Sequence, residues 1–214
     1  MSDLPRYYAA RASEYERIYA KPERQQDLAT LATAVSAYFA DSQLIEMACG
    51  TGWWTRHAAV RARRVVGVDI NEEVLAIALA KHYPGDNTRF VCADFNRVID
   101  VHGTFDAALV AHWWSHIDRR EQRRFFAALH GYVQPGARVM LLDNRFVQGS
   151  STPIARTDAH GNSYQVRSLD SGVTYEVMKN FPTTTEFEEL LTGWASDLRF
   201  VELDYYWYLT YRLA

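Results

Sequence analysis

The stretch Leu44–Thr55, with the sequence L-I-E-M-A-C-G-T-G-W-W-T, decides the fold. It begins as a short apolar run of strand type and passes through Gly50 and Gly52 into a helix-compatible segment, Trp53–Arg61. A strand that turns through glycines into a helix exposes backbone N–H groups at the helix N-terminus, and glycine lets a ligand approach the backbone closely. The pattern therefore predicts a ligand site at the carboxyl end of this first strand.

An acidic residue follows at a distance typical of nucleotide sites. Arg64–Ile70 reads as a second buried strand that ends in Asp69. An acid about 20 residues after the glycine turn can accept hydrogen bonds from ribose hydroxyls. The alternative is that Asp69 is only a polar residue at the end of a strand. The turn and the acid together favour a nucleoside ligand more strongly than either feature alone.

Two classes of nucleotide site fit the glycine turn. The dinucleotide fingerprint has a third small residue, where this chain has Thr55. The first strand also contains an acid, and Glu46-x-Ala48-x-Gly50-x-Gly52 resembles the first motif, E/D-x-G-x-G-x-G, of class I S-adenosylmethionine (SAM)-dependent methyltransferases. Ala48 stands in the first glycine position of that motif. An NAD(P)-dependent oxidoreductase and a glycine turn without a ligand remain the alternatives.

The resemblance covers residues 5–146 by motif and the rest by strand order, and it implies a cofactor site. In this family an acid at the end of the third strand accepts a hydrogen bond from the adenine amino group, and the next residue donates its backbone N–H to the ring. The predicted strand Thr88–Phe95 ends in two residues that match these positions. The implied cofactor-binding residues are Glu46, Ala48, Gly50, Gly52, Trp54, Thr55, Asp69, Ile70, Asp94, Phe95 and Ala111.

The resemblance also implies an α/β fold, a Rossmann-like doubly wound sheet of seven mostly parallel strands with an antiparallel last strand and helices on both faces. Further strands are expected over Phe105–Trp114 and, after a turn at Gln134-Pro135-Gly136, over Ala137–Phe146. We expect a single domain over residues 1–214 (the size of one α/β core). Its parts would be an N-terminal helical arm at 1–40, a SAM-binding core at 41–146, a substrate-side hairpin insertion at 147–182, and a C-terminal helix and strand pair at 183–214.

Aromatic residues make up 14% of the chain, and several recur at roughly helical spacing in the N-terminal arm. They are Tyr7, Tyr8, Tyr15 and Tyr19. Such a stripe is commonly core packing, but tyrosine is amphipathic, so the arm could also close over a site as a lid. The pattern Y-Y-x-x-R-A-x-E-Y-x-x-x-Y resembles the N-terminal arm of many small-molecule methyltransferases. A second helix is expected over Glu23–Phe39.

The C-terminal third departs from simple alternation of strands and helices. Ser163–Leu169 and Val173–Asn180 alternate apolar and polar residues around a turn sequence, which predicts a hairpin. A helix is expected over Thr183–Trp194, followed by an antiparallel pair, Leu198–Tyr205 and Tyr206–Leu213. Class I methyltransferases place variable and often substrate-binding insertions just before such a closing pair.

His112 and His116, at the end of the fourth predicted strand, are the candidate catalytic residues. An imidazole titrates near neutral pH and can accept a proton from an attacking amine, ring nitrogen or hydroxyl, or orient that group. The alternative is that both histidines are structural. The candidate substrate contacts are Tyr8, Tyr19, Trp113 and Arg145.

Methyl transfer from SAM by in-line SN2 displacement to a nitrogen or oxygen is the reaction that the resemblance implies, with S-adenosylhomocysteine (SAH) as product. Tryptophans near the predicted ligand-binding turns favour a small, planar or aromatic acceptor that could stack on them. These are Trp53, Trp54, Trp113 and Trp114. A SAM-binding protein that transfers no methyl group, such as a cyclase-like or regulatory protein, is a further alternative.

Arginines offer a second kind of ligand contact. Arg11, Arg24 and Arg145 could bind the methionine carboxylate of SAM or an acidic substrate, although solvation at the surface is the commoner role.

Composition limits the partners. The net charge of −3 provides no basic field for a polyanion, and the chain lacks an N/D-P-P-Y/F motif at the fourth strand, so we expect no nucleic-acid substrate. Without an apolar signal core or a long apolar span, we expect no membrane partner and a cytoplasmic location. Cys49 and Cys92 form no disulfide framework. No metal-ligand spacing is present, and a monomer or homodimer acting on a small molecule is expected.

Overall fold

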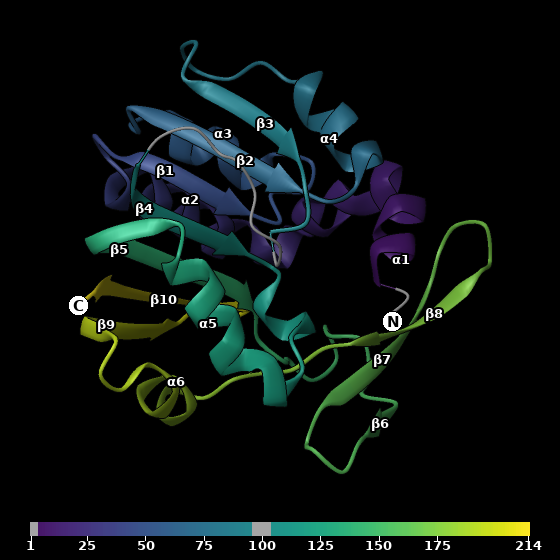
Figure 1. Ribbon diagram of the computed structural model, residues 1–214. Helices are drawn as coiled ribbons and strands as arrows, with labels where there is room; N and C mark the ends of the chain where they lie inside the picture. The colour runs from purple at the N-terminus through teal and green to yellow at the C-terminus, as the bar shows by residue number, and fades with distance from the viewer. Residues whose placement is uncertain (1–3, 96–103) are drawn as a thin grey trace.

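The protein is described by a computed structural model that covers residues 4–95 and 104–214. Its centre is a seven-stranded sheet with the strand order β3-β2-β1-β4-β5-β10-β9 (Figure 1). The strands are β1 (Gln43–Met47), β2 (Arg64–Asp69), β3 (Thr88–Cys92), β4 (Phe105–Ala111), β5 (Val133–Asn144), β9 (Ala195–Glu202) and β10 (Tyr206–Leu213). β10 runs opposite to the other six strands of this sheet, so its pairings with β5 and β9 are antiparallel, and the predicted fold class is confirmed.

The strand order reverses between β1 and β4, which are neighbours in the sheet but far apart in the chain. Met47 of β1 pairs with Val68 of β2 and Val110 of β4, so the three strands end in line. In open parallel sheets, ligands bind in the crevice outside the carboxyl ends of the strands at such a reversal. The fold therefore places the glycine turn after β1 at the centre of this crevice.

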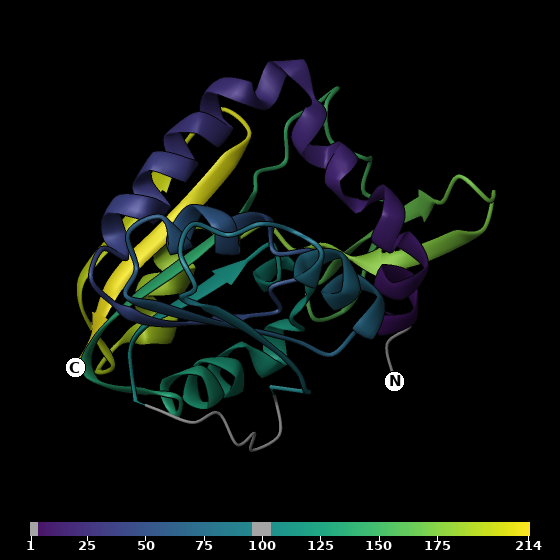
Figure 2. The same cartoon turned by 90° about the horizontal axis from the view of Figure 1, so that it is seen from above.

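Helices cover both faces of the sheet, as Figures 1 and 2 show. Helices α2 (Gln25–Tyr38) and α3 (Trp53–Ala59) pack on one face, and α5 (Gln122–His130) and α6 (Thr184–Leu191) pack on the other. Helix α4 (Glu72–Leu79) follows β2. The central strands are apolar on both sides, which is typical of parallel strands with covered faces.

The N-terminal arm is less regular than the sequence predicts. Helix α1 (Leu4–Arg11) continues as the 3₁₀-helices η1 (Ala12–Ala20) and η2 (Pro22–Arg24) before α2 begins. A 3₁₀ run of nine residues is uncommon, and a stretch of this kind often marks a functional hinge or a sequence under strain. In Figures 1 and 2 this arm lies beyond the carboxyl ends of the central strands, next to the C-terminal insertion.

The insertion forms a separate three-stranded sheet, with β6 (Arg156–Thr157), β7 (Ser163–Ser168) and β8 (Thr174–Met178). The predicted hairpin is thus confirmed as β7–β8, and a short third strand adds to it. Leu169 and Val177 of this segment pack with Leu4 and Tyr7 of α1 in a small apolar cluster. This cluster holds the arm and the insertion together over the strand ends.

Several strand boundaries differ from the sequence prediction; β9, for example, runs from Ala195 to Glu202 instead of from Leu198 to Tyr205. β3 and β4 end a few residues early, and the chain after β4 turns into the 3₁₀-helix η3 (Trp114–His116). Strand β5 begins at Val133, so the predicted turn at Pro135-Gly136 is instead an irregularity inside the strand, where the β4–β5 register shifts and Gly136 has φ +79°. A glycine accommodates this local bulge without a Cβ clash.

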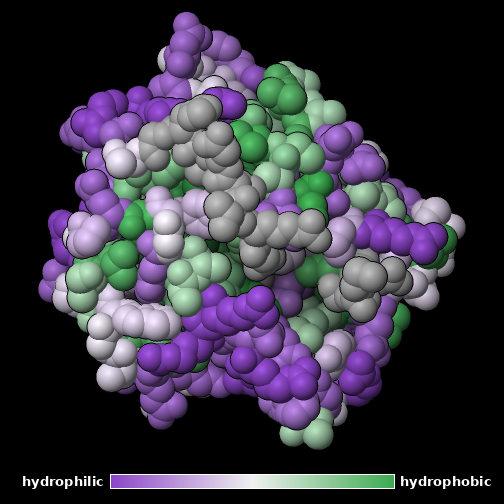
Figure 3. Space-filling model, viewed as in Figure 1, coloured by the Kyte–Doolittle hydropathy of each residue, from purple (hydrophilic) through white to green (hydrophobic). Residues whose placement is uncertain are grey.

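Figure 3 shows hydrophilic side chains spread over all parts of the face seen in Figure 1, with hydrophobic ones between them. Within residues 4–95 and 104–214, no helix combines the length and the apolar character needed to cross a membrane.

Candidate active site

The turn after β1 uses three small residues with positive φ: Ala48 (52°), Gly50 (55°) and Gly52 (73°). A Cβ at Gly50 would meet nothing within 4 Å, so this residue faces open space, whereas a Cβ at Gly52 would collide with the hydroxyl of Tyr83. Ala48 adopts a backbone conformation that costs a non-glycine residue about 1–2 kcal/mol. A ligand can therefore approach the backbone closely at Gly50, whereas Gly52 packs closely against Tyr83.

Asp69, at the end of β2, fixes this turn. One carboxylate oxygen accepts a hydrogen bond from Gly50 N (2.8 Å), and the other accepts from Asn71 N (2.9 Å). Burial raises the pKa of Asp69, and these backbone donors oppose the rise. Since each carboxylate oxygen has two lone pairs, the group keeps acceptor capacity for a ligand.

Glu46 lies buried behind the turn. Its Oε2 accepts a hydrogen bond from Thr55 Oγ1 (2.5 Å), and its Oε1 has no partner among the described residues. Burial raises the pKa of Glu46 to about 8. A buried carboxyl oxygen without a partner is costly, and such atoms are commonly completed by a ligand or a water molecule.

A cavity of about 240 Å³ opens beside the turn. Among its lining are the predicted cofactor residues Ala48, Gly50, Asp69, Ile70, Asp94, Phe95 and Ala111. The remaining predicted cofactor residues, Glu46, Gly52, Trp54 and Thr55, lie outside its lining. Trp54 packs into the core beside α2, and Thr55 is buried against Glu46. The sequence missed Leu4, Pro5, Tyr15, Asn71 and Val74, which come from the arm and from the start of α4.

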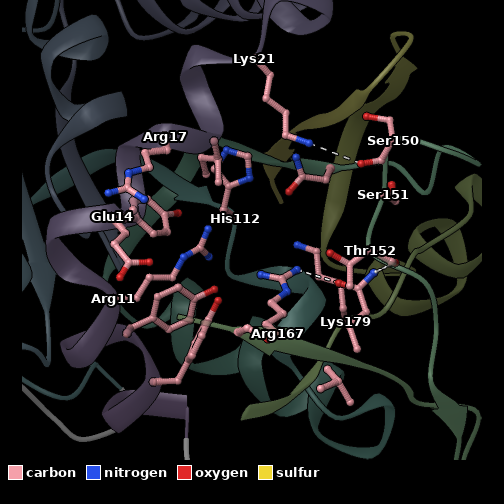
Figure 4. Close-up of a pocket in the computed structure, with 18 of the residues that line it drawn as sticks. Arg11, Glu14, Arg17, Lys21, His112, Ser150, Ser151, Thr152, Arg167 and Lys179 are labelled. Atoms are coloured by element: carbon pink, nitrogen blue, oxygen red, sulfur yellow. Dashed lines mark hydrogen bonds between the residues drawn. The ribbon is translucent and has the colours of Figure 1, made fainter. Parts of the chain in front are cut away.

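A second cavity, of about 340 Å³, lies between the N-terminal arm and the insertion (Figure 4). It shares Tyr8, Tyr15 and His112 with the first cavity, so these side chains form the boundary between the two. Of the predicted substrate residues, Tyr8 and Arg145 line the second cavity, and Trp113 lines the first. Tyr19 lines neither, because its ring stacks on Trp53 with centroids 4.2 Å apart.

His112 lies at this boundary with φ 58°. Its Nδ1 is 3.4 Å from Asp143 Oδ1, and its Nε2 has no partner in the part of the chain that the structure describes. Because an ionised carboxylate only accepts, Nδ1 carries the proton and Nε2 presents a lone pair. Burial lowers the pKa of His112, with Asp143 opposing the shift, so the imidazole is neutral near pH 7.

Asp143 is the centre of a buried polar network. Its Oδ1 accepts from Lys179 Nζ (2.6 Å), and its Oδ2 accepts from Ser115 Oγ (2.7 Å). Burial alone would raise the pKa of Asp143, but Lys179 and His112 lower it well below its usual range. Burial lowers the pKa of Lys179 to about 8. The network thus fixes a carboxylate against His112.

His116 is held differently. Its Nδ1 is 2.6 Å from the carbonyl of Met178, and its Nε2 is 2.6 Å from the hydroxyl of Tyr8. The carbonyl only accepts, so Nδ1 donates to it and Nε2 accepts from Tyr8. Both ring nitrogens are therefore engaged, and this geometry favours positioning of Tyr8; a catalytic role for His116 stays a prediction.

Within residues 4–95 and 104–214, no group of three or more His, Cys, Asp and Glu side chains could hold a metal ion. Both cysteines are free thiols, with Cys49 buried and Cys92 exposed.

Comparisons with known proteins place this geometry in a family. Residues 44–136 match a family model described as a methyltransferase domain. The structure of DhpI in complex with SAH superposes with a TM-score of 0.75 at 29% identity, covering 98% of this chain and 95% of that chain. The complex of DhpI with SAM and HEP has the same TM-score at 27% identity, covering 96% and 94%. These matches support a class I SAM-dependent methyltransferase.

A further structural match supports the fold of this methyltransferase. A SAM-dependent methyltransferase from Clostridium acetobutylicum has a TM-score of 0.66 at 16% identity and covers 94% of this chain and 98% of that chain. A search of curated proteins found no significant match. The predicted family, the enzyme class and the use of SAM are confirmed, and the oxidoreductase alternative is set aside.

Proposed function

We propose that this methyltransferase binds SAM in the 240 Å³ cavity and transfers its methyl group to a nitrogen or oxygen of a small molecule in the 340 Å³ cavity. The observation that carries the proposal is the shared boundary: Tyr8, Tyr15 and His112 line both cavities. A donor and an acceptor that occupy adjoining cavities can meet only at that boundary.

The residues of the smaller cavity fit an S-adenosyl nucleoside. Asp69 retains acceptor capacity for ribose hydroxyls, Asp94 and Phe95 line the cavity and match the family's adenine positions by motif, and Gly50 leaves space for close approach of the amino-acid tail. When bound, SAM supplies an activated methyl group on a positively charged sulfur.

The protein's part in the reaction is to orient the acceptor and to accept its proton. His112 offers Nε2 as a base, because Asp143 holds the Nδ1 proton and the imidazole is neutral near pH 7. Lys179 and Ser115 hold Asp143 in turn. A positioned base of this kind contributes about 10²–10⁴ to a rate.

Tyrosines of the arm exclude water from the meeting point. Tyr8 is held by His116, and burial keeps the pKa of both Tyr8 and Tyr15 above the usual range, so neither hydroxyl ionises near neutral pH. The arm therefore fits the lid role that its tyrosine pattern suggests.

The positions of the four tryptophans give no support for a planar or aromatic acceptor. Trp53 stacks on Tyr19, Trp54 and Trp114 are buried in the core, and Trp113 lines the cofactor cavity. None of these rings lines the 340 Å³ cavity, so acceptor planarity rests on no tryptophan contact.

Calorimetric titration with SAH tests the cofactor site. The wild-type protein should bind SAH, and Asp69→Ala should weaken binding at least about tenfold, because a hydrogen bond to a charged group contributes about 1.5–3 kcal/mol. The exposed acid Asp204 supplies the control, and Asp204→Ala should bind normally. Equal affinity in the Asp69 variant would contradict the ribose assignment.

Turnover separates a transferase from a protein that only binds SAM. Formation of SAH from SAM should depend on an added acceptor. A protein that binds SAH but produces none of it from SAM with any small acid, amine or alcohol would favour the regulatory alternative.

A further inference from the structure

The 340 Å³ cavity is unusually basic for a protein with a net charge of −3. Its lining includes a single carboxylate side chain, Glu14, within the described part of the chain. The cationic side chains that line it are Arg11, Arg17, Lys21, Arg24, Arg145, Arg167 and Lys179. Charge of one sign in an enclosed space favours a ligand of the opposite sign.

Part of this charge is already balanced inside the protein. Arg17 pairs with Asp170 (2.6 Å), Arg145 with Glu202 (3.2 Å) and Lys179 with Asp143 (2.6 Å). In residues 4–95 and 104–214, no ion pair involves the other cations, which are Arg11, Lys21, Arg24 and Arg167. Arg11 lies over the rings of Tyr7 and Tyr15, and Arg24 lies over those of Tyr205 and Tyr206, but these contacts leave the positive charges without a carboxylate partner.

Two of the unbalanced guanidinium groups have buried nitrogen atoms without partners. Arg24 is only 7% exposed, and its Nε makes no hydrogen bond to a described residue, although NH2 donates to Ser150 Oγ (3.2 Å). Arg167 likewise has a buried, unpartnered Nε, and its NH2 donates to Gln165 Oε1 (2.8 Å). Buried cationic groups are rarely left without an anion, because desolvation of the charge is costly.

The basic groups come together from separate elements. Figure 4 shows the guanidinium groups of Arg11, from α1, and Arg167, from β7, extending into the space beside His112. Both positive charges act to lower the pKa of Lys179, which agrees with their closeness to it. The methionine carboxylate of SAM could neutralise one of these cations, but it carries only one negative charge.

We propose that the methyl acceptor carries a compact oxyanion group, and that Arg11, Arg24 and Arg167 bind this group beside His112. This inference rests on the proposed function, since it names the substrate class of the same cavity. The guanidinium fork suits both phosphoryl and carboxylate oxygens, so either source of the oxyanion satisfies the site.

Calorimetric titration of the SAH-loaded protein tests this inference. The probes are ethylphosphonate, propionate and the neutral isostere propionamide. We expect either or both anions to bind and propionamide to bind at least about tenfold more weakly, because it lacks the charge that the guanidinium groups require. The relative affinity of the two anions then distinguishes a phosphoryl from a carboxylate substrate.

Substitutions of two cavity arginines test whether the anion binds in the 340 Å³ cavity. Arg167→Gln should weaken the anion that the wild type binds by about tenfold or more, and Arg167→Lys should retain part of its affinity. Arg11→Gln provides a second variant if the first is poorly folded. Arg199→Gln is the matched control, because Arg199 is exposed on β9 and lines neither cavity.

The results that would overturn the oxyanion inference differ from those that would contradict the proposed function. Propionamide affinity equal to that of the anions, no anion binding at all, or anion affinity unchanged in both the Arg167→Gln and Arg11→Gln variants would overturn the oxyanion inference. Failure of the wild type to bind SAH would instead contradict the cofactor assignment. In that case the same anion titration without SAH still decides the inference.

Discussion

His112 carries backbone strain where the two cavities meet. Its φ of 58° costs about 1–2 kcal/mol for a non-glycine residue. Its backbone N–H donates to the carbonyl of Leu142 (2.8 Å), and its ring faces the carboxylate of Asp143, so the sheet edge holds it in this conformation. Strained residues of this kind cluster at functional sites.

Replacement of this side chain should separate chemistry from cofactor binding. His112→Ala should change SAH affinity less than about threefold and lower the rate of methyl transfer about 10²–10⁴-fold, the range for loss of a positioned base. The paired measurements are a calorimetric titration with SAH and the rate of SAH formation with an acceptor. A full transfer rate in this variant would contradict the proton-accepting role.

Glu46 should make the stability of the unliganded protein depend on pH. Its folded pKa of about 8 lies above the ordinary value of 4.5, so its stabilising contribution is fully present below pH 4.5 and is lost as pH rises through 8. Between pH 5.5 and 8.5, this should cost about 3 kcal/mol of stability.

Glu46→Gln removes this titration and keeps the side-chain volume. The difference in unfolding free energy between variant and wild type, measured in urea at pH 5.5 and 8.5, should grow at the higher pH in favour of the variant. Because both proteins contain the same buried histidines, the pH dependence of this difference reports the titration of Glu46. Parallel pH profiles would show that Glu46 titrates normally.

At the scale of elements, the strand–turn–helix unit of residues 43–59 was accessible from sequence, because its signals are local. The apolar run, the two glycines and Asp69 each follow from short-range backbone requirements. The assignment of Trp54 and Thr55 to the cofactor was made on motif spacing alone. Their side chains instead turn away from the cavity into the core, which spacing along a motif does not reveal.

The insertion shows what the sequence did not reveal. Its hairpin was predicted from alternation, but Arg167 and Lys179 were not recognised as site residues. Lys179 reaches Asp143 and Ser115 across a long stretch of chain, and no local motif encodes such a contact. The acceptor side of the site therefore depends on how the insertion docks, which only the tertiary structure gives.

The geometry of the glycine turn predicts how much stability a side chain at Gly52 would cost. Gly52→Ala should destabilise the protein by about 1–3 kcal/mol, because Gly52 has φ 73° and a Cβ would collide with Tyr83. The double variant Gly52→Ala, Tyr83→Phe should recover the part due to the hydroxyl and keep the part due to φ. Urea unfolding of the four proteins of this cycle measures the coupling. If the effects of the two substitutions on the unfolding free energy simply added, the proposed collision with the Tyr83 hydroxyl would be contradicted.

At the scale of the whole molecule, the sheet provides a rigid edge, and two segments from opposite ends of the chain meet over it. Leu4 and Tyr7 of the arm pack with Leu169 and Val177 of the insertion, and Arg17 of the arm bridges to Asp170. Of these residues, Tyr7 and Arg17 also line the 340 Å³ cavity. The single-domain organisation, a monomeric or homodimeric state and a cytoplasmic location stay predictions from sequence.

The most direct measurement is a crystal structure of this methyltransferase with SAH. Adenine is predicted to lie at Asp94 and Phe95, ribose at Asp69, and the amino-acid tail over Gly50, with the sulfur directed toward His112. Density for SAH elsewhere on the protein, or a sulfur directed away from the boundary between the two cavities, would contradict the account.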